Sequence, residues 1–149
     1  MSIDDLFDKS DGQDLGARLI ASLEGLQAAF AAAQDHEATA FRSSVRTAVQ
    51  SARQNPQIVA RYCLELDWKP HDLALMMVMQ CAVSFATSGE FVSTRGVLTS
   101  QGNGFRLVVE RCLEMLVESG RITPEIADIE RRELDADVEE TEPLWPPAR

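Results

Sequence analysis

The stretch DLALMMVMQCAVSFATSG, residues 72–89, decides the fold, because it is far more apolar than the acidic chain around it. Between Leu73 and Ala86 only Gln80 and Ser84 are clearly polar. A membrane-spanning helix needs about 20 predominantly apolar residues, and this run is shorter. Polar residues close it at both ends. We therefore predict a core helix over residues 70–88, surrounded by other helices or by a second subunit.

Length and charge indicate one acidic globular domain. The chain has 149 residues, with 24 Asp and Glu against 14 Lys and Arg, for a formal net charge of −10. A DNA-binding protein usually carries a basic surface, because phosphate neutralisation supplies much of its affinity. We therefore do not expect nucleic-acid binding.

The cysteines and the start of the chain favour a cytoplasmic protein. Cys63, Cys81 and Cys112 are odd in number and widely spaced, so they do not form a disulfide framework. Each stands among apolar residues, where a free cysteine behaves as a small hydrophobic side chain. The first residues, MSIDDLFDKSDG, are acidic where a signal peptide is basic.

Apolar residues that recur every three or four positions predict an all-α fold. We expect a compact bundle of five to six helices, with the helix over residues 70–88 at its centre. The expected helices cover residues 14–33, 37–54, 56–66, 70–88, 105–119 and a segment from Thr123 with a thin apolar face of Ile126, Ile129 and Leu134. The bundle spans residues 14–134, after a flexible segment at 1–13. Residues 135–149 form an acidic, proline-containing tail that we predict to be disordered.

Residues 90–104, EFVSTRGVLTSQGNG, are expected to form a loop with one short helical turn. A hairpin is the alternative, but the segment has no NG or DG turn in the right place. Gly96, Gly102 and Gly104 interrupt any periodicity, and Asn103 fits the N-cap of the following helix. A helix start can attract anions, so the segment is either a mobile loop or a lid over an anion or ligand. The Walker pattern of phosphate-binding loops is absent.

No catalytic or metal-binding pattern stands out. His36 and His71 lie on different segments, and neither belongs to a recognised ligand spacing. The three cysteines lack the environment that activates a thiol. We expect no enzymatic activity, no metal and no cofactor.

An arginine-rich, carboxylate-free segment is the most distinctive polar feature. From Phe41 to Arg61 there is no Asp or Glu, and Arg42, Arg46, Arg53 and Arg61 all occur. The first three fall within about 40° of one another on a helix. They either face carboxylates of the protein itself, such as those of the acidic tail, or recognise an acidic partner or a phosphate group.

Two other places are candidate sites. Trp145, in PLWPP, either folds back onto the bundle or anchors a partner. Met76, Met77 and Met115, with Gln80 and Ser84, either pack in the core, line an apolar pocket, or form a homodimer seam. We expect Gln80 and Ser84 to be buried, where polar groups need partners.

The leading functional hypothesis is a non-catalytic cytoplasmic protein-interaction module of the adaptor, immunity or chaperone type. Its partner is another protein with an acidic patch, contacted through the arginines, the Trp-containing tail, or both. The alternative is a protein that binds or senses a small apolar ligand in a methionine-lined pocket between helices.

Overall fold

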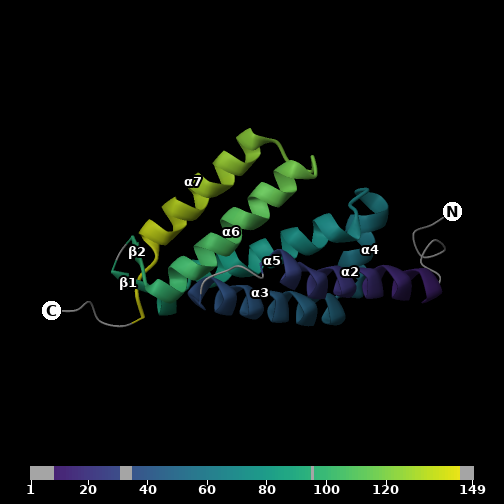
Figure 1. Ribbon diagram of the computed structural model, residues 1–149, viewed down its shortest axis with the longest axis horizontal. Coiled ribbons are helices and arrows are strands. Elements are labelled where there is room, and N and C mark those ends of the chain that lie inside the picture. The colour runs from purple at the N-terminus through teal and green to yellow at the C-terminus, as the bar shows by residue number, and fades with distance from the viewer. Residues whose placement is uncertain (1–8, 31–34, 95, 145–149) are drawn as a thin grey trace.

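The computed structural model describes residues 9–30, 35–94 and 96–144. In these ranges six α-helices and one small hairpin pack together, which confirms the all-α bundle (Figure 1). None of the helices in these ranges is long and apolar enough to cross a membrane. The helices are α2 (Lys9–Ala29), α3 (Asp35–Gln54), α4 (Pro56–Ala60), α5 (Pro70–Ala86), α6 (Ser100–Glu118) and α7 (Pro124–Glu140).

The apolar helix α5 lies at the centre of the bundle, as predicted, and contacts α2, α3 and α6. It begins at Pro70, because the first helical position needs no backbone N–H donor. These contacts remove most of its apolar side chains from water. The buried residues are Asp72, Leu73, Ala74, Leu75, Val78, Met79, Ala82 and Ala86.

One side of α5 is nevertheless open. Met76, Met77 and Cys81 are half-buried, and Gln80 and Ser84 are exposed. The prediction that Gln80 and Ser84 are buried is therefore wrong, because the neighbouring helices cover only part of the circumference of α5. The amide Nε2 of Gln80 lies 3.7 Å from the sulfur of Met76.

Helices α2 and α3 form an antiparallel hairpin beside α5. Leu19 and Leu23 of α2 are fully buried, and the ring of Phe30 stacks on that of Phe41 with centroids 3.9 Å apart. Ala48 of α3 is fully buried, and its short side chain allows close approach of the neighbouring helices. Helix α2 begins at Lys9, inside the segment predicted to be flexible.

The predicted helix over residues 56–66 is divided into α4 and a π-helical turn, η1 (Arg61–Glu65). The amide of Leu66 donates to the carbonyl of Arg61 at 3.2 Å, a five-residue spacing that widens the turn. Leu66 is consequently exposed, although a regular helix would place it on the buried side with Val59. Ile58 of α4 is exposed as well.

Residues 90–104 are more regular than predicted. After a 3₁₀ turn, η2 (Gly89–Phe91), strands β1 (Val92–Thr94) and β2 (Val97–Leu98) pair antiparallel. Helix α6 then begins at Ser100, and its N-cap is Thr99, whose hydroxyl accepts from the amide of Gly102 at 3.0 Å. The predicted cap, Asn103, lies inside the helix.

The glycines at the start of α6 are required by close packing. A β-carbon on Gly102 would lie 2.4 Å from the carbonyl oxygen of Phe91, and one on Gly104 would lie 2.4 Å from that of His36. Only glycine allows the first turn of α6 to approach the hairpin and α3 so closely.

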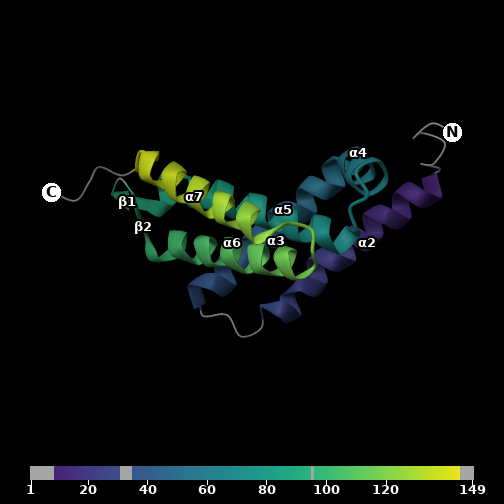
Figure 2. The same cartoon turned by 90° about the horizontal axis from the view of Figure 1, so that it is seen from above.

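Helix α7 packs on α6 through Ala127, Leu134 and Val138. It continues to Glu140, so the prediction of disorder is wrong for residues 135–140. Ile126 and Ile129 were predicted on its buried face, but they are exposed on the outward side. Figure 1 shows α7 along the upper edge of the bundle and α2 and α3 along the lower edge, and α7 faces the viewer in Figure 2.

Candidate protein-interaction surface

Three arginines of α3 form an exposed basic surface, which we call the arginine face. Its members are Arg42, Arg46 and Arg53, at the helical spacing that the sequence predicts. No ion pair joins any of the three to a carboxylate in the part of the chain that the structure describes. Arg42 only donates to the hydroxyl of Thr39, at 3.4 Å.

Arg61, the fourth predicted arginine, does not extend this unpaired surface. Its Nε lies 3.4 Å from a carboxylate oxygen of Glu65, one turn further along η1. The pair is largely exposed to water, where such interactions contribute little to stability. Arg61 therefore has a carboxylate of its own.

A pocket of about 240 Å³ between α2 and α3 adjoins the arginine face. Phe41 and Leu23 contribute buried apolar surface, and Val45 is half-buried beside them. We call it the arginine pocket; its lining residues are Leu23, Glu24, Phe41, Arg42, Val45 and Arg46. An apolar recess flanked by two guanidinium groups can hold an apolar side chain and neighbouring carboxylates at once.

Several other arginines of the described segments are matched by carboxylates, although Arg18 and Arg132 have no ion pair there. Arg111 of α6 binds the buried carboxylate of Glu37, and this hydrogen bond raises the pKa of Arg111. The Nε of Arg121 lies 3.7 Å from Asp72, beside a cation–π contact with Trp68.

Ion pairs also connect the acidic helix α7 to α6. Asp135 pairs with Arg106 at 3.0 Å, and Glu110 pairs with Arg131 at 2.7 Å. The hydrogen bond to Glu110 raises the pKa of Arg131. Within residues 9–30, 35–94 and 96–144, these two carboxylates therefore neutralise arginines of α6 and α7, and no ion pair reaches the arginine face.

Of the residues predicted to line a methionine pocket, four lie on the open side of α5, and Met115 lies on α6. Met76, Met77 and Met115 are half-buried, whereas Gln80 and Ser84 are exposed. None of these five residues lines any of the pockets described in this section. Trp145, the remaining candidate, lies outside the described residues.

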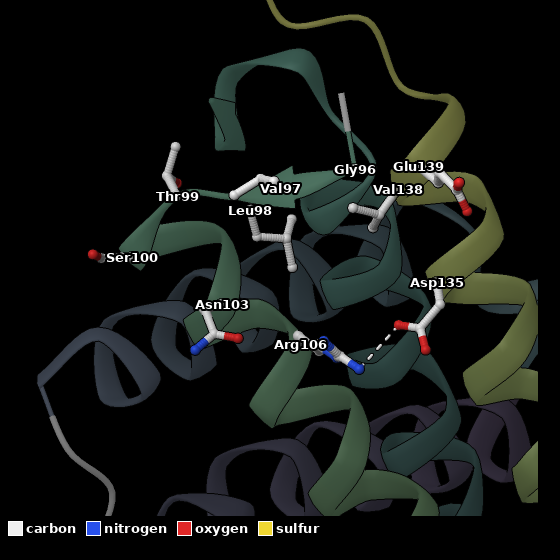
Figure 3. Close-up of a pocket in the computed structure, with 10 residues that line it drawn as sticks. All are labelled: Gly96, Val97, Leu98, Thr99, Ser100, Asn103, Arg106, Asp135, Val138 and Glu139. Atoms are coloured by element: carbon white, nitrogen blue, oxygen red, sulfur yellow. Dashed lines mark ion pairs between the residues drawn. The ribbon is translucent and has the colours of Figure 1, made fainter. Parts of the chain in front are cut away.

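A larger pocket of about 720 Å³ lies between the hairpin, the start of α6 and the end of α7 (Figure 3). Arg106 faces Asp135 across it, and Glu139 lines it as well. Among the described residues, the carboxylates of Asp135 and Glu139 offset the guanidinium group of Arg106, so the charge does not favour an anion. The sequence did not predict this pocket, because it depends on the hairpin and on the extended α7.

A third pocket, of about 420 Å³, lies between the start of α3 and the start of α6. Its lining combines the rings of Phe91 and Phe105 with the side chains of His36, Thr39 and Gln101. No charged side chain of the described segments lines it. It offers shape and apolar surface, but no group that selects the charge of a ligand.

The environments of the three cysteine thiols do not activate them as nucleophiles. Burial raises the pKa of Cys63 and Cys81, and it raises the pKa of Cys112 to about 12. At neutral pH these side chains therefore remain thiols, which are poor nucleophiles. In the described ranges no three His, Cys, Asp or Glu side chains are grouped to hold a metal ion.

Comparison with known proteins adds no relative: no family model, no curated protein and no solved structure matches the chain. The functional interpretation therefore depends on the surface itself.

Proposed function

We propose that this protein is a non-catalytic interaction module that binds an acidic segment of a protein through the arginine face and the arginine pocket. The observation that carries this proposal is the unpaired state of Arg42, Arg46 and Arg53 among the described residues. In a chain with 24 acidic residues, three exposed guanidinium groups on one side of one helix, none of them paired with a carboxylate of the described residues, are out of character.

The chemistry of the surface defines the partner. Guanidinium groups bind carboxylates with directed, charge-assisted hydrogen bonds. The arginine pocket adds an apolar recess beside Arg42 and Arg46. The best fit is therefore an amphipathic helix that inserts one apolar side chain and places carboxylates on either side of it.

The net charge of the molecule favours a protein partner over nucleic acid. A net charge of −10 makes the long-range field of the molecule repel a polyanion. A short acidic segment approaches only the arginine face, where local attraction prevails over distances below about 10 Å at 0.1 M salt.

We also propose that the protein acts in the cytoplasm. Cys63, Cys81 and Cys112 are all free. Free thiols are typical of a reducing compartment.

Fluorescence anisotropy tests the binding proposal. The probe is a labelled amphipathic helical peptide with a leucine anchor flanked by glutamates, and a peptide with lysines in place of the glutamates serves as its counterpart. We expect binding of the acidic peptide only. Substitution of Arg42 and Arg46 by alanine should lower the affinity by about tenfold, since each exposed ion pair contributes about 0.2–1 kcal/mol and the pocket contacts are lost with them.

Arg132→Ala provides the matched control, because Arg132 is exposed on α7, away from the arginine pocket. It removes one positive charge, as each of the two substitutions in the arginine face does, and should leave peptide binding unchanged. Equal losses in both variants would show that only net charge matters and would overturn the proposal.

A further inference from the structure

We infer that the acidic helix recognised by the arginine face is α7 of a second copy of this chain. This inference rests on the proposed function and names its partner. It follows from the outward side of α7, from a match of spacings, and from the positions of the two surfaces.

The outward side of α7 has the chemistry that the arginine pocket requires. Ile126 and Ile129 are 44% and 47% exposed, although both are large and apolar. Glu133 and Glu140 lie on the same side of the helix and are exposed. Neither carboxylate takes part in an ion pair within the described residues.

The spacings on the two helices correspond. Glu133 and Glu140 follow Ile129 by four and eleven residues, and Arg46 and Arg53 follow Arg42 by the same intervals. Both helices rise about 1.5 Å per residue, so the two sets repeat over equal lengths. With α7 parallel to α3, Ile129 lies at the arginine pocket while Glu133 and Glu140 face Arg46 and Arg53.

One copy cannot join its own two surfaces. Helix α7 lies along the upper edge of the bundle in Figure 1, and α2 and α3 lie along the lower edge. Because the two surfaces lie at opposite edges, one pair of copies cannot form both contacts at once, and the contact between α7 of one copy and α3 of the next is heterologous. Repetition of such a contact generates rings or open chains of molecules.

Overall repulsion does not prevent this contact at moderate salt. Each copy carries −10, but charges further apart than about 10 Å are largely screened at 0.1 M salt. Close guanidinium–carboxylate pairs are screened less. We therefore expect self-association to be measurable near 0.1 M salt.

Analytical ultracentrifugation of the full chain over a concentration series tests the inference. The wild-type protein should form species larger than a dimer as its concentration rises. Arg46→Glu and Glu133→Arg should each weaken the association by about tenfold or more, because each places like charges opposite one another.

Charge exchange provides the rescue. A mixture of the Arg46→Glu and Glu133→Arg proteins should associate again, since every contact between unlike variants pairs opposite charges. The double variant R46E/E133R should also self-associate. Glu118→Arg is the control, because Glu118 is exposed at the end of α6, outside both surfaces, and should leave association unchanged.

The outcomes separate this inference from the proposed function. A chain that stays monomeric but binds the acidic peptide through Arg42 and Arg46 overturns the inference and leaves the proposed function standing. Self-association that neither charge reversal alters assigns the contact to another surface, such as the open side of α5, and also overturns the inference. Loss of both peptide binding and self-association overturns both.

Discussion

Arg111 of α6 donates a hydrogen bond to Glu37 of α3, whose carboxylate is buried while the arginine is half-exposed. The pair connects the start of α3 to the middle of α6. The carboxylate depends on this partner, because an unpaired charge away from water is costly. The half-exposed guanidinium group of Arg111, in contrast, can be hydrated by water if the carboxylate is removed.

This asymmetry predicts unequal effects of removing either partner. Arg111→Ala should lower the free energy of unfolding by about 1–3 kcal/mol, because it leaves the buried Glu37 without a donor. Glu37→Gln should cost less, since the exposed Arg111 gains water. Urea denaturation of both variants checks the order. A larger loss for Glu37→Gln would contradict the account of the pair.

Alanine substitutions at two glycines should change the stability of the fold in opposite directions. Gly104→Ala should destabilise the fold by about 1–3 kcal/mol, because its β-carbon meets the backbone of His36. Gly25→Ala is the matched control, since nothing of the described structure lies within 4 Å of the added carbon. It should stabilise α2 by about 0.5–1 kcal/mol. Thermal unfolding distinguishes them, and the same sign for both would refute the packing argument.

Burial of Cys112 predicts a loss of stability at alkaline pH. Its pKa is raised from 9.0 to about 12 in the folded protein, so the unfolded chain loses this proton first. The contribution of Cys112 is therefore complete below pH 9 and is lost as the pH rises towards 12, by up to about 1.4 kcal/mol per pH unit.

Comparison with Cys112→Ala isolates this effect, because Cys63 and Cys81 remain in both proteins. Urea midpoints measured between neutral pH and about pH 10.5 should fall more steeply for the wild type, since only it has the thiol that titrates in the unfolded chain. Parallel pH profiles for the two proteins would show that the Cys112 thiol does not titrate as proposed.

Features that depend only on the repeat of the α-helix can be predicted well from the sequence. The apolar run from Leu73 to Ala86 indicates a central helix, and the spacing of Arg42, Arg46 and Arg53 places them on one side of α3. Both features follow from helical geometry alone.

What the sequence does not predict depends on contacts between distant segments. The sequence predicts that Gly102 and Gly104 lie in a loop. They lie inside α6 instead, where the backbones of Phe91 and His36 leave no space for a β-carbon. The acidic end of α7 is helical because Leu134 and Val138 pack on the bundle and Arg106 pairs with Asp135.

The candidate surface was predictable only in part. The sequence indicates which arginines share a side, but it leaves open whether carboxylates of α7 neutralise them. The structure answers this, because no ion pair joins Arg42, Arg46 or Arg53 to a carboxylate within the described residues. The arginine pocket requires the packing of Leu23 against Phe41 and Val45, which no local pattern specifies.

The most direct test of the central claim is to map where an acidic helix binds, using NMR chemical-shift changes in the labelled full chain. With the glutamate-flanked peptide, the account predicts saturable shifts confined to residues near Leu23 on α2 and between Phe41 and Arg53 on α3, and none with the lysine peptide. Shifts of equal size spread over α5, α6 and α7, or none at all, would contradict it.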